Sequence, residues 1–184
     1  MKKIATLCLL VISIAAFAQE TPAETIDNPK NEFKVNAFNL IALNLIDVSY
    51  EHLKNEETSF GVSVQFNVSG DSEWDTDYYR SFGLTGFYRK YFSKKYAKGF
   101  FVEGFGMLNS GKDDYHIYDY DTDSLTLAYD DSYTDFALGV SIGGKWATRG
   151  GFVMEVFGGA GRNLFNETGP DVVGRGGVSL GYRF

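Results

Sequence analysis

Hydrophobic and polar residues alternate with a period of two along most of this chain. In the stretch 60–68, apolar residues occupy every second position, and Gly, Ser, Gln and Asn occupy the positions between them. The stretches 132–147 and 172–184 repeat the pattern, whereas the spacing typical of amphipathic helices is almost absent. A period of two is typical of a strand whose two faces meet different surroundings. The sequence therefore predicts an all-β protein.

The alternation predicts eight strands. Several of them exceed the roughly five to six residues usual in soluble proteins and approach the about nine to eleven that a tilted strand needs to cross a bilayer. All 3 prolines fall outside the strands, as unbroken ladders require. The predicted strands are 32–42, 46–53, 58–68, 79–92, 99–108, 132–147, 151–161 and 172–184.

The polar face of these strands is small and sparsely charged, because it consists mainly of Gly, Ser, Asn and Ala. The solvent face of a soluble sandwich carries more Lys, Glu and Thr. A small polar face fits the interior of a closed barrel whose apolar face meets lipid, and closure pairs the backbone groups that an open edge would leave unpaired in hydrocarbon. We predict one domain over 32–184, an eight-stranded antiparallel up-and-down transmembrane β-barrel. A soluble secreted barrel or sandwich is the alternative.

The first 18 residues have the organisation of a cleavable signal peptide. Lys2 and Lys3 precede an apolar run over 4–15, and a small-x-small motif ends at Ala18, before Gln19. The run is shorter than the roughly 20 residues of a spanning helix. We therefore predict cleavage between Ala18 and Gln19, and export of the chain.

Composition narrows the class further. The net charge of -7 argues against a nucleic-acid-binding protein, which needs a basic face. Hydrophobic residues make up 44% of the chain, so it is not disordered by composition. Cys8, the single cysteine, lies in the predicted signal peptide, which leaves neither a disulfide framework nor a cysteine-rich metal site. The polar segment 19–31 is predicted to be flexible.

The last strand resembles the C-terminal signal by which outer-membrane assembly machinery recognises its clients. Its alternating apolar and aromatic residues are Val178, Leu180, Tyr182 and Phe184. The stretch 87–95, followed by 98–102, is similar to small outer-membrane barrels of the Bacteroidota and, more distantly, to OmpX and the barrel domain of OmpA. The resemblance covers essentially all of 32–184. It implies a location in the outer membrane of a Gram-negative cell, with outer-membrane lipid and the assembly machinery as partners, and it carries over no catalytic residue.

The predicted connections differ in length and charge. The long ones, 69–78, 109–131 and 162–171, total -11, whereas the short ones total +3. Long external loops and short periplasmic turns are the outer-membrane pattern. Aromatic residues near the strand ends predict interfacial girdles. The periplasmic girdle would comprise Tyr88, Tyr91, Phe92, Phe100, Tyr182 and Phe184, and the external one Tyr78, Tyr79, Tyr133 and Phe165.

The alternation also places charges of both signs inside the barrel. The inward set is Lys34, Arg89, Lys145, Arg175, Arg183, Asp47, Glu51, Glu103, Asp135 and Glu155. Strand direction puts Lys34, Glu51, Arg89, Glu103, Lys145, Glu155 and Arg183 in the periplasmic half. Eight strands enclose only enough room for side chains, so a balanced set is expected to pair and plug the lumen. A narrow channel for ions or small solutes is the alternative.

Catalysis has few candidate residues. Some eight-stranded outer-membrane barrels modify lipid A, which needs a serine activated by histidine. His52 is predicted to face lipid, and His116 lies in the acidic loop. The serines that could partner His116 are Ser110, Ser124 and Ser132, and their spacing distinguishes none of them. We therefore expect neither an enzyme nor a cofactor, with a lipid-A-modifying enzyme as a remote alternative.

The acidic loop supports two further hypotheses. Asp119, Asp121 and Asp123, with Asp130, partly match a calcium loop. Ser124 stands where the turn glycine is expected, and the final Glu is replaced, so a solvated acidic loop without metal is favoured.

Tyrosines interleaved with aspartates in the same loop have a composition suited to an adaptable contact surface. The equal alternative is that these aromatic residues rest at the outer membrane interface. The overall prediction is a monomeric barrel with a structural or surface-interaction role, whose external loops meet an unknown surface partner.

Overall fold

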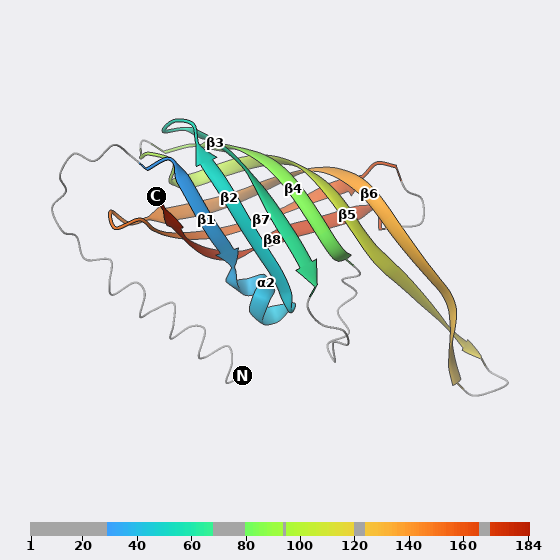
Figure 1. The fold of residues 1–184 in the computed structure, drawn as a ribbon. Coiled ribbons are helices and arrows are strands. Elements are labelled where there is room, and N and C mark those ends of the chain that lie inside the picture. Colours follow the sequence, from blue (N-terminus) through green and yellow to red (C-terminus); the bar gives the residue numbers. More distant parts are fainter. Residues whose placement is uncertain (1–28, 68–79, 94, 120–123, 166–169) are drawn as a thin grey trace.

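The computed structural model describes residues 29–67, 80–93, 95–119, 124–165 and 170–184, and of 112–119 and 124–131 the backbone only. Eight antiparallel strands follow one another around a closed barrel, and β1 pairs with β8 to complete it (Figure 1). This confirms the predicted eight-stranded up-and-down barrel. Within the described residues, no helix is long and apolar enough to span a membrane. The elements are β1 Asn31–Asn36, α2 Ala37–Ala42, β2 Leu45–Leu53, β3 Thr58–Asn67, β4 Arg80–Tyr91, β5 Gly99–Asp119, β6 Ser124–Ala147, β7 Phe152–Asn163 and β8 Val172–Arg183.

Alternate residues along each strand face the inside and the outside of the barrel. On β6, Val140 is 65% exposed while its neighbour Ser141 is 2% exposed, and Trp146 is 55% exposed while Lys145 is 1% exposed. Four of the ladders run without a shift of register, from β2 to β4 and from β6 to β8, so these strands keep one set of alternate positions inside. The fold thus encloses the polar and charged residues, together with buried apolar side chains such as Phe87, Phe101 and Phe105, within an apolar outer surface.

The turn between β4 and β5 closes one end of the barrel. We call this the terminal end, because β1 begins and β8 ends there. Ala97, in the turn, is fully buried and adopts a φ of 40°. Its carbonyl oxygen accepts a hydrogen bond from Arg183 Nη2 at 2.9 Å, and the Tyr96 carbonyl accepts one from Nη1 at 3.2 Å. Ala97 belongs to a buried apolar cluster, whose other members are Leu53, Tyr91, Phe101 and Phe157.

The predicted strand 32–42 is wrong in its second half, because β1 ends at Asn36 and α2 follows. Asn36 caps the helix, and its side-chain oxygen accepts a hydrogen bond from Asn39 N at 3.2 Å. Gly177 on β8, with a φ of 144°, leaves room for the Asn36 side chain, since a Cβ there would overlap it. The apolar run over 37–42 fits a strand or a helix equally well, and the cap selects the helix.

The predicted loop 109–131 is wrong for most of its length. Strands β5 and β6 pair from Gly99 opposite Lys145 to Asp119 opposite Ser124, with one irregularity at Tyr115/His116. Neighbouring strands pair with them only as far as Gly111 and Ala137, so the rest of the hairpin extends past the barrel wall (Figure 1). Tyr, Ile and Leu interleaved with the acidic residues favour strand despite the charge. We call the end of the barrel from which the β5–β6 hairpin extends the hairpin end.

Two residues predicted for the aromatic girdles face inward instead. Tyr91 is 1% exposed and Tyr133 is 3% exposed. Both share the parity of inward neighbours, and parity rather than nearness to a strand end decides which face an aromatic ring occupies. The other described members are exposed on the outer surface or, for Phe165, on the connection after β7: Tyr88, Phe92, Phe100, Phe165, Tyr182 and Phe184. Tyr78 and Tyr79 lie outside the described residues.

Candidate functional site in the barrel interior

The terminal half of the interior holds a continuous network of buried charges, which we call the ion cluster. All seven residues predicted for the periplasmic half of the lumen belong to it, together with two others. Its members are Glu32, Lys34, Glu51, Arg89, Glu103, Lys145, Glu155, Arg175 and Arg183. They come from every strand except β3, so the network ties opposite walls of the barrel together.

Arg89 lies at the centre of the ion cluster. Its Nε donates to Glu103 Oε2 at 2.6 Å, and its Nη1 lies 2.8 Å from Glu51 Oε2. Nη1 and Nη2 also bind the two oxygens of Glu155, at 2.6 and 2.9 Å. The guanidinium carbon lies 4.5 Å from the ring centre of Phe87 and 4.4 Å from that of Phe101. One side chain thus joins three carboxylates and two aromatic rings.

Two lysines and two further arginines complete the pairing, and Arg175 supplies the second cation for Glu103. Lys145 Nζ donates to Glu32 Oε2 at 2.8 Å and to Glu51 Oε1 at 2.7 Å. Lys34 Nζ donates to Glu51 and, at 2.9 Å, to Glu155. Arg183 donates to Glu32 Oε1 from Nη2 at 2.6 Å. Every glutamate of the cluster therefore has at least two cationic partners, which is the condition under which buried charges are tolerated.

Sequence reasoning missed two inward charges. Glu32 shares the parity of Lys34, two positions along the same strand, so the alternation contained the signal. Arg80 is 6% exposed, and its Nη1 donates to Gln65 Oε1 at 3.1 Å inside the barrel. An irregularity of register between Arg80 and Phe82 turns Arg80 inward, against the parity of Arg89. No sequence pattern marks that irregularity.

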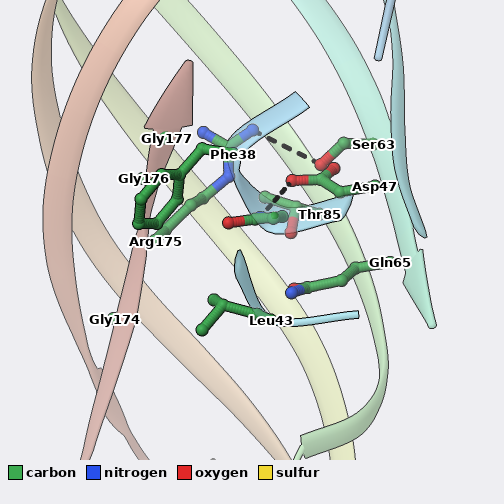
Figure 2. A pocket seen from close by; sticks show the side chains of 11 residues that line it. Phe38, Leu43, Asp47, Ser63, Gln65, Thr85, Gly174, Arg175, Gly176 and Gly177 are labelled. Atoms are coloured by element: carbon green, nitrogen blue, oxygen red, sulfur yellow. Dashed lines mark hydrogen bonds between the residues drawn. The ribbon is translucent and has the colours of Figure 1, made fainter. Parts of the chain in front are cut away.

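The hairpin half of the interior contains a cavity of about 290 Å³, which we call the α2 pocket. Figure 2 shows it bounded by α2 and by strands β2, β3, β4 and β8. Arg175 and Ser63 lie on its floor, and Asp47 stands beside them. Its described lining residues are Phe38, Asn39, Leu43, Asp47, Ser63, Gln65, Thr85, Gly174, Arg175, Gly176 and Gly177.

Asp47 and Asp135, both predicted to face inward, lie in this half and accept hydrogen bonds from uncharged groups. Asp47 Oδ2 accepts hydrogen bonds from Asn36 Nδ2 at 3.0 Å and Asn39 Nδ2 at 2.9 Å. Asp135 Oδ1 accepts from the backbone nitrogens of Phe136, Leu164 and Phe165. Asp135 therefore anchors the connection after β7, whereas Asp47 faces the pocket.

The outer surface forms an apolar belt. Lys90 lies near its terminal edge and Arg162 near its hairpin edge. Between them, no outward position of the described strands carries Asp, Glu, Lys or Arg. Among its most exposed residues are Phe60, Val62, Tyr88, Leu138, Val140, Ile142 and Trp146. A soluble protein rarely exposes so continuous an apolar surface.

The remaining candidate residues lie apart from the interior. Val178, Leu180, Tyr182 and Phe184 alternate on the outer face of the C-terminal strand, with Tyr182 and Phe184 more than half exposed. His52 Nδ1 lies 2.9 Å from Asn31 Oδ1, and its ring packs on Phe60.

Several predictions fall where the structure describes no side chains. Ala18, Gln19, Asp121 and Asp123 lie outside the described residues, as do the side chains of His116, Asp119 and Asp130. Among the described residues, no group of three or more His, Cys, Asp or Glu is placed to hold a metal ion.

The hydrogen-bonded ladders between neighbouring strands identify the fold as a closed barrel. Comparison with known proteins identifies no relative: the chain matches no family model, no curated protein and no solved structure.

Proposed function

We propose that this protein is an integral outer-membrane β-barrel with a structural or surface-interaction role and a plugged lumen. The observation that carries the proposal is the apolar belt, free of charged residues, around an interior that holds the ion cluster. Apolar residues outside and charged residues inside are the reverse of a soluble fold. Hydrocarbon around the barrel would make both faces favourable, because lipid covers the belt and closure pairs the backbone.

The paired charges and the covered terminal end of the barrel support a plugged lumen rather than a channel. The ion cluster spans the terminal half, and the turn with Ala97 covers that end. Eight strands enclose little space beyond their own side chains. The alternative, a narrow channel for ions or small solutes, would require these paired groups to separate.

The β5–β6 hairpin supports a surface role. Its ladder continues from Lys112 opposite Ser132 to Asp119 opposite Ser124, past the last residues paired with β4 and β7. In the proposed orientation the hairpin extends outside the cell and the terminal end faces the periplasm, which matches the acidic long and basic short connections. The unknown partner would contact this hairpin, and the barrel itself would be monomeric.

The proposed role is not enzymatic and needs no cofactor. His52 contacts Asn31 and Phe60 on the outer face, and within the described residues no serine is hydrogen-bonded to it. An acyl-transfer mechanism needs a serine and a histidine within hydrogen-bond reach.

Export would use the proposed signal peptide 1–18, and insertion would use the last strand, in the manner of OmpX-like barrels. The test is to express the full chain in a Gram-negative host, separate the envelope fractions and compare heated with unheated samples on a gel. We expect the protein in the outer-membrane fraction, with a mobility that changes on heating because the closed barrel resists unfolding. Recovery of folded protein in the soluble periplasmic fraction would contradict the proposal.

A matched pair of variants tests the role of the last strand. Phe184→Ala removes the terminal aromatic residue and should lower the amount of inserted protein several-fold. Phe165→Ala makes the same change at an exposed residue of the hairpin end and should leave insertion unchanged. Equal insertion of both variants would exclude Phe184 from the assembly signal.

A further inference from the structure

The wall of the barrel is incomplete where β1 ends early. Pairing of β1 with β2 stops at Val35 opposite Val48, and pairing with β8 stops at Asn36 opposite Ser179. Strand β8 nevertheless continues to Val172, and β2 begins at Leu45. The two strand edges therefore lack a strand between them at the hairpin end, and α2 lies there instead (Figure 1).

Side chains donate hydrogen bonds to two β8 carbonyl oxygens on the stretch that β1 does not reach. Asn36 Nδ2 donates to the Gly176 carbonyl at 3.1 Å, and Arg80 Nη2 donates to the Gly174 carbonyl at 3.0 Å. The α2 pocket lies at this place, lined by α2, by Leu43 and by residues of β2, β3, β4 and β8.

Asp47 is an unneutralised carboxylate in this pocket. Its Oδ2 accepts two amide hydrogen bonds, whereas Oδ1 has no donor among the described residues. No described cation lies within ion-pair distance, in contrast to every glutamate of the ion cluster. A buried or half-buried carboxylate without a cation is costly, so the site favours a ligand that brings a positive charge.

Arg175 places a positive charge at the same floor. Its guanidinium binds Glu103 through Nη1 and reaches Ser63 Oγ from Nη2 at a long 3.3 Å, as Figure 2 shows for the second contact. The guanidinium carbon of Arg175 lies 5.2 Å from the Phe87 ring centre and 5.0 Å from that of Phe157. The two rings help to hold the guanidinium in place. Arg175 and Asp47 both line the pocket, yet no ion pair joins them.

A ligand for this floor must satisfy both charges. Arg175 is already paired with Glu103, so a ligand carboxylate would share that guanidinium with Glu103. A ligand ammonium group would supply the ion-pair partner that Asp47 lacks among the described residues, and a lone anion at Arg175 would be repelled by Asp47. Phe38 and Leu43 border the pocket on the side of α2 and supply apolar surface. The volume of about 290 Å³ equals that of roughly ten water molecules, at the lower end of ligand pockets.

We propose that the α2 pocket binds a small zwitterion of the size of an amino acid or dipeptide. Its ammonium group pairs with Asp47 Oδ1, its carboxylate accepts hydrogen bonds from Arg175, and an apolar side chain packs on Phe38 and Leu43. Because the ion cluster closes the lumen beyond Arg175, the pocket retains the ligand and does not pass it through the barrel. The proposal rests on the pocket alone and holds whether or not the barrel lies in a membrane.

Calorimetric titration of the purified full-length protein with three matched probes tests the ligand class. L-Leucine carries both charges, 4-methylpentanoate lacks the ammonium group, and 3-methylbutylamine lacks the carboxylate. We expect L-leucine or the dipeptide glycyl-leucine to bind at millimolar or lower concentration, and the two single-charge analogues to bind at least tenfold more weakly. Absence of binding by both zwitterions, or equal binding of a single-charge analogue, would overturn the proposal.

Three variants locate the binding. Asp47→Asn keeps the shape of the side chain and an oxygen for the amide donors, and should weaken zwitterion binding at least tenfold. Asp171→Asn makes the same change at an exposed residue outside the pocket and should bind as wild type. Phe38→Ala alters a 44% exposed side chain, so it leaves the fold intact and should weaken binding several-fold. Unchanged affinity in both Asp47→Asn and Phe38→Ala would place any binding elsewhere and refute the assignment.

Discussion

Arg89 on β4 and Glu155 on β7 meet across the barrel interior, with Nη1 2.6 Å from Oε2, although no ladder joins their strands. A hydrophobic side chain in either position could not form a directional hydrogen bond between the two strands. The contact shows that charged side chains form part of the core of this barrel, beside the buried apolar side chains. Removing one member of such a network leaves its partners buried and uncompensated.

Replacing Arg89 by methionine should therefore destabilise the barrel strongly. The change leaves Glu51, Glu103 and Glu155 with fewer cations, and breaking a buried pair in this way costs about 3–5 kcal/mol. Equilibrium unfolding in urea, followed in detergent or lipid by the gel-mobility change, measures the effect.

Lys90→Met is the control for this variant. Lys90 is adjacent in sequence, but its ion pair with Glu57 is exposed, so its loss should leave the unfolding midpoint nearly unchanged. Similar midpoints for Arg89→Met and Lys90→Met would show that the ion cluster does not hold the fold.

Two glycines on opposite faces of the wall should respond differently to the same change. A Cβ at Gly139 would overlap the Phe105 ring and lie 2.6 Å from the Ala160 carbonyl oxygen, whereas a Cβ at Gly158 would meet nothing within 4 Å. Gly139→Ala should cost about 1–3 kcal/mol through overpacking, and Gly158→Ala should be neutral or gain up to about 1 kcal/mol. Unfolding midpoints compare the two variants, and an equal cost at both would contradict the assigned faces.

Asn36→Ala should loosen α2 without unfolding the barrel. The substitution removes the helix cap to Asn39 N, worth about 1 kcal/mol, and the bonds to Asp47 and Gly176. Hydrogen exchange measured by mass spectrometry should become faster over 37–44 while the strands remain protected. Leu40→Ala, on the exposed side of the same helix, keeps the cap and should exchange more slowly than Asn36→Ala; the reverse order would show that Asn36 does not hold the helix.

A plugged lumen should not conduct. Purified protein in a planar bilayer should give no steady current, because ions would have to displace paired charges in the ion cluster. A general porin in the same apparatus provides the positive control. Reproducible unitary steps from the protein would favour the channel alternative.

The barrel could be predicted from the sequence because its two faces differ so consistently. A period of two places Glu51, Arg89 and Lys145 inside without knowledge of strand order, since parity alone decides the face. The same rule reaches its limit where the backbone departs from regular strand. The irregularity at Arg80 and the helix that begins after Asn36 depend on neighbouring strands, which local pattern does not contain.

The α2 pocket could not be predicted for the same reason. Asp47 was placed inside by its parity, but its lack of a cation depends on where Arg175 and Arg80 direct their side chains. The pocket exists because β1 stops at Asn36, and the residues that follow are apolar in a way that suits strand and helix alike. The acidic composition of 109–131 predicted a loop. Most of the segment forms strand, because its Tyr, Ile and Leu residues have high β propensity.

The accessibility of single nitroxide labels in lipid vesicles tests the central claim most directly. With Cys8 replaced by alanine, Val140→Cys places a label on the outer belt, and Thr148→Cys places one in the turn between β6 and β7. The label at Val140 should collide readily with oxygen dissolved in lipid and rarely with a water-soluble nickel complex, and the label at Thr148 should show the opposite. If the nickel complex reaches both labels equally, the outer belt faces water and the account is wrong.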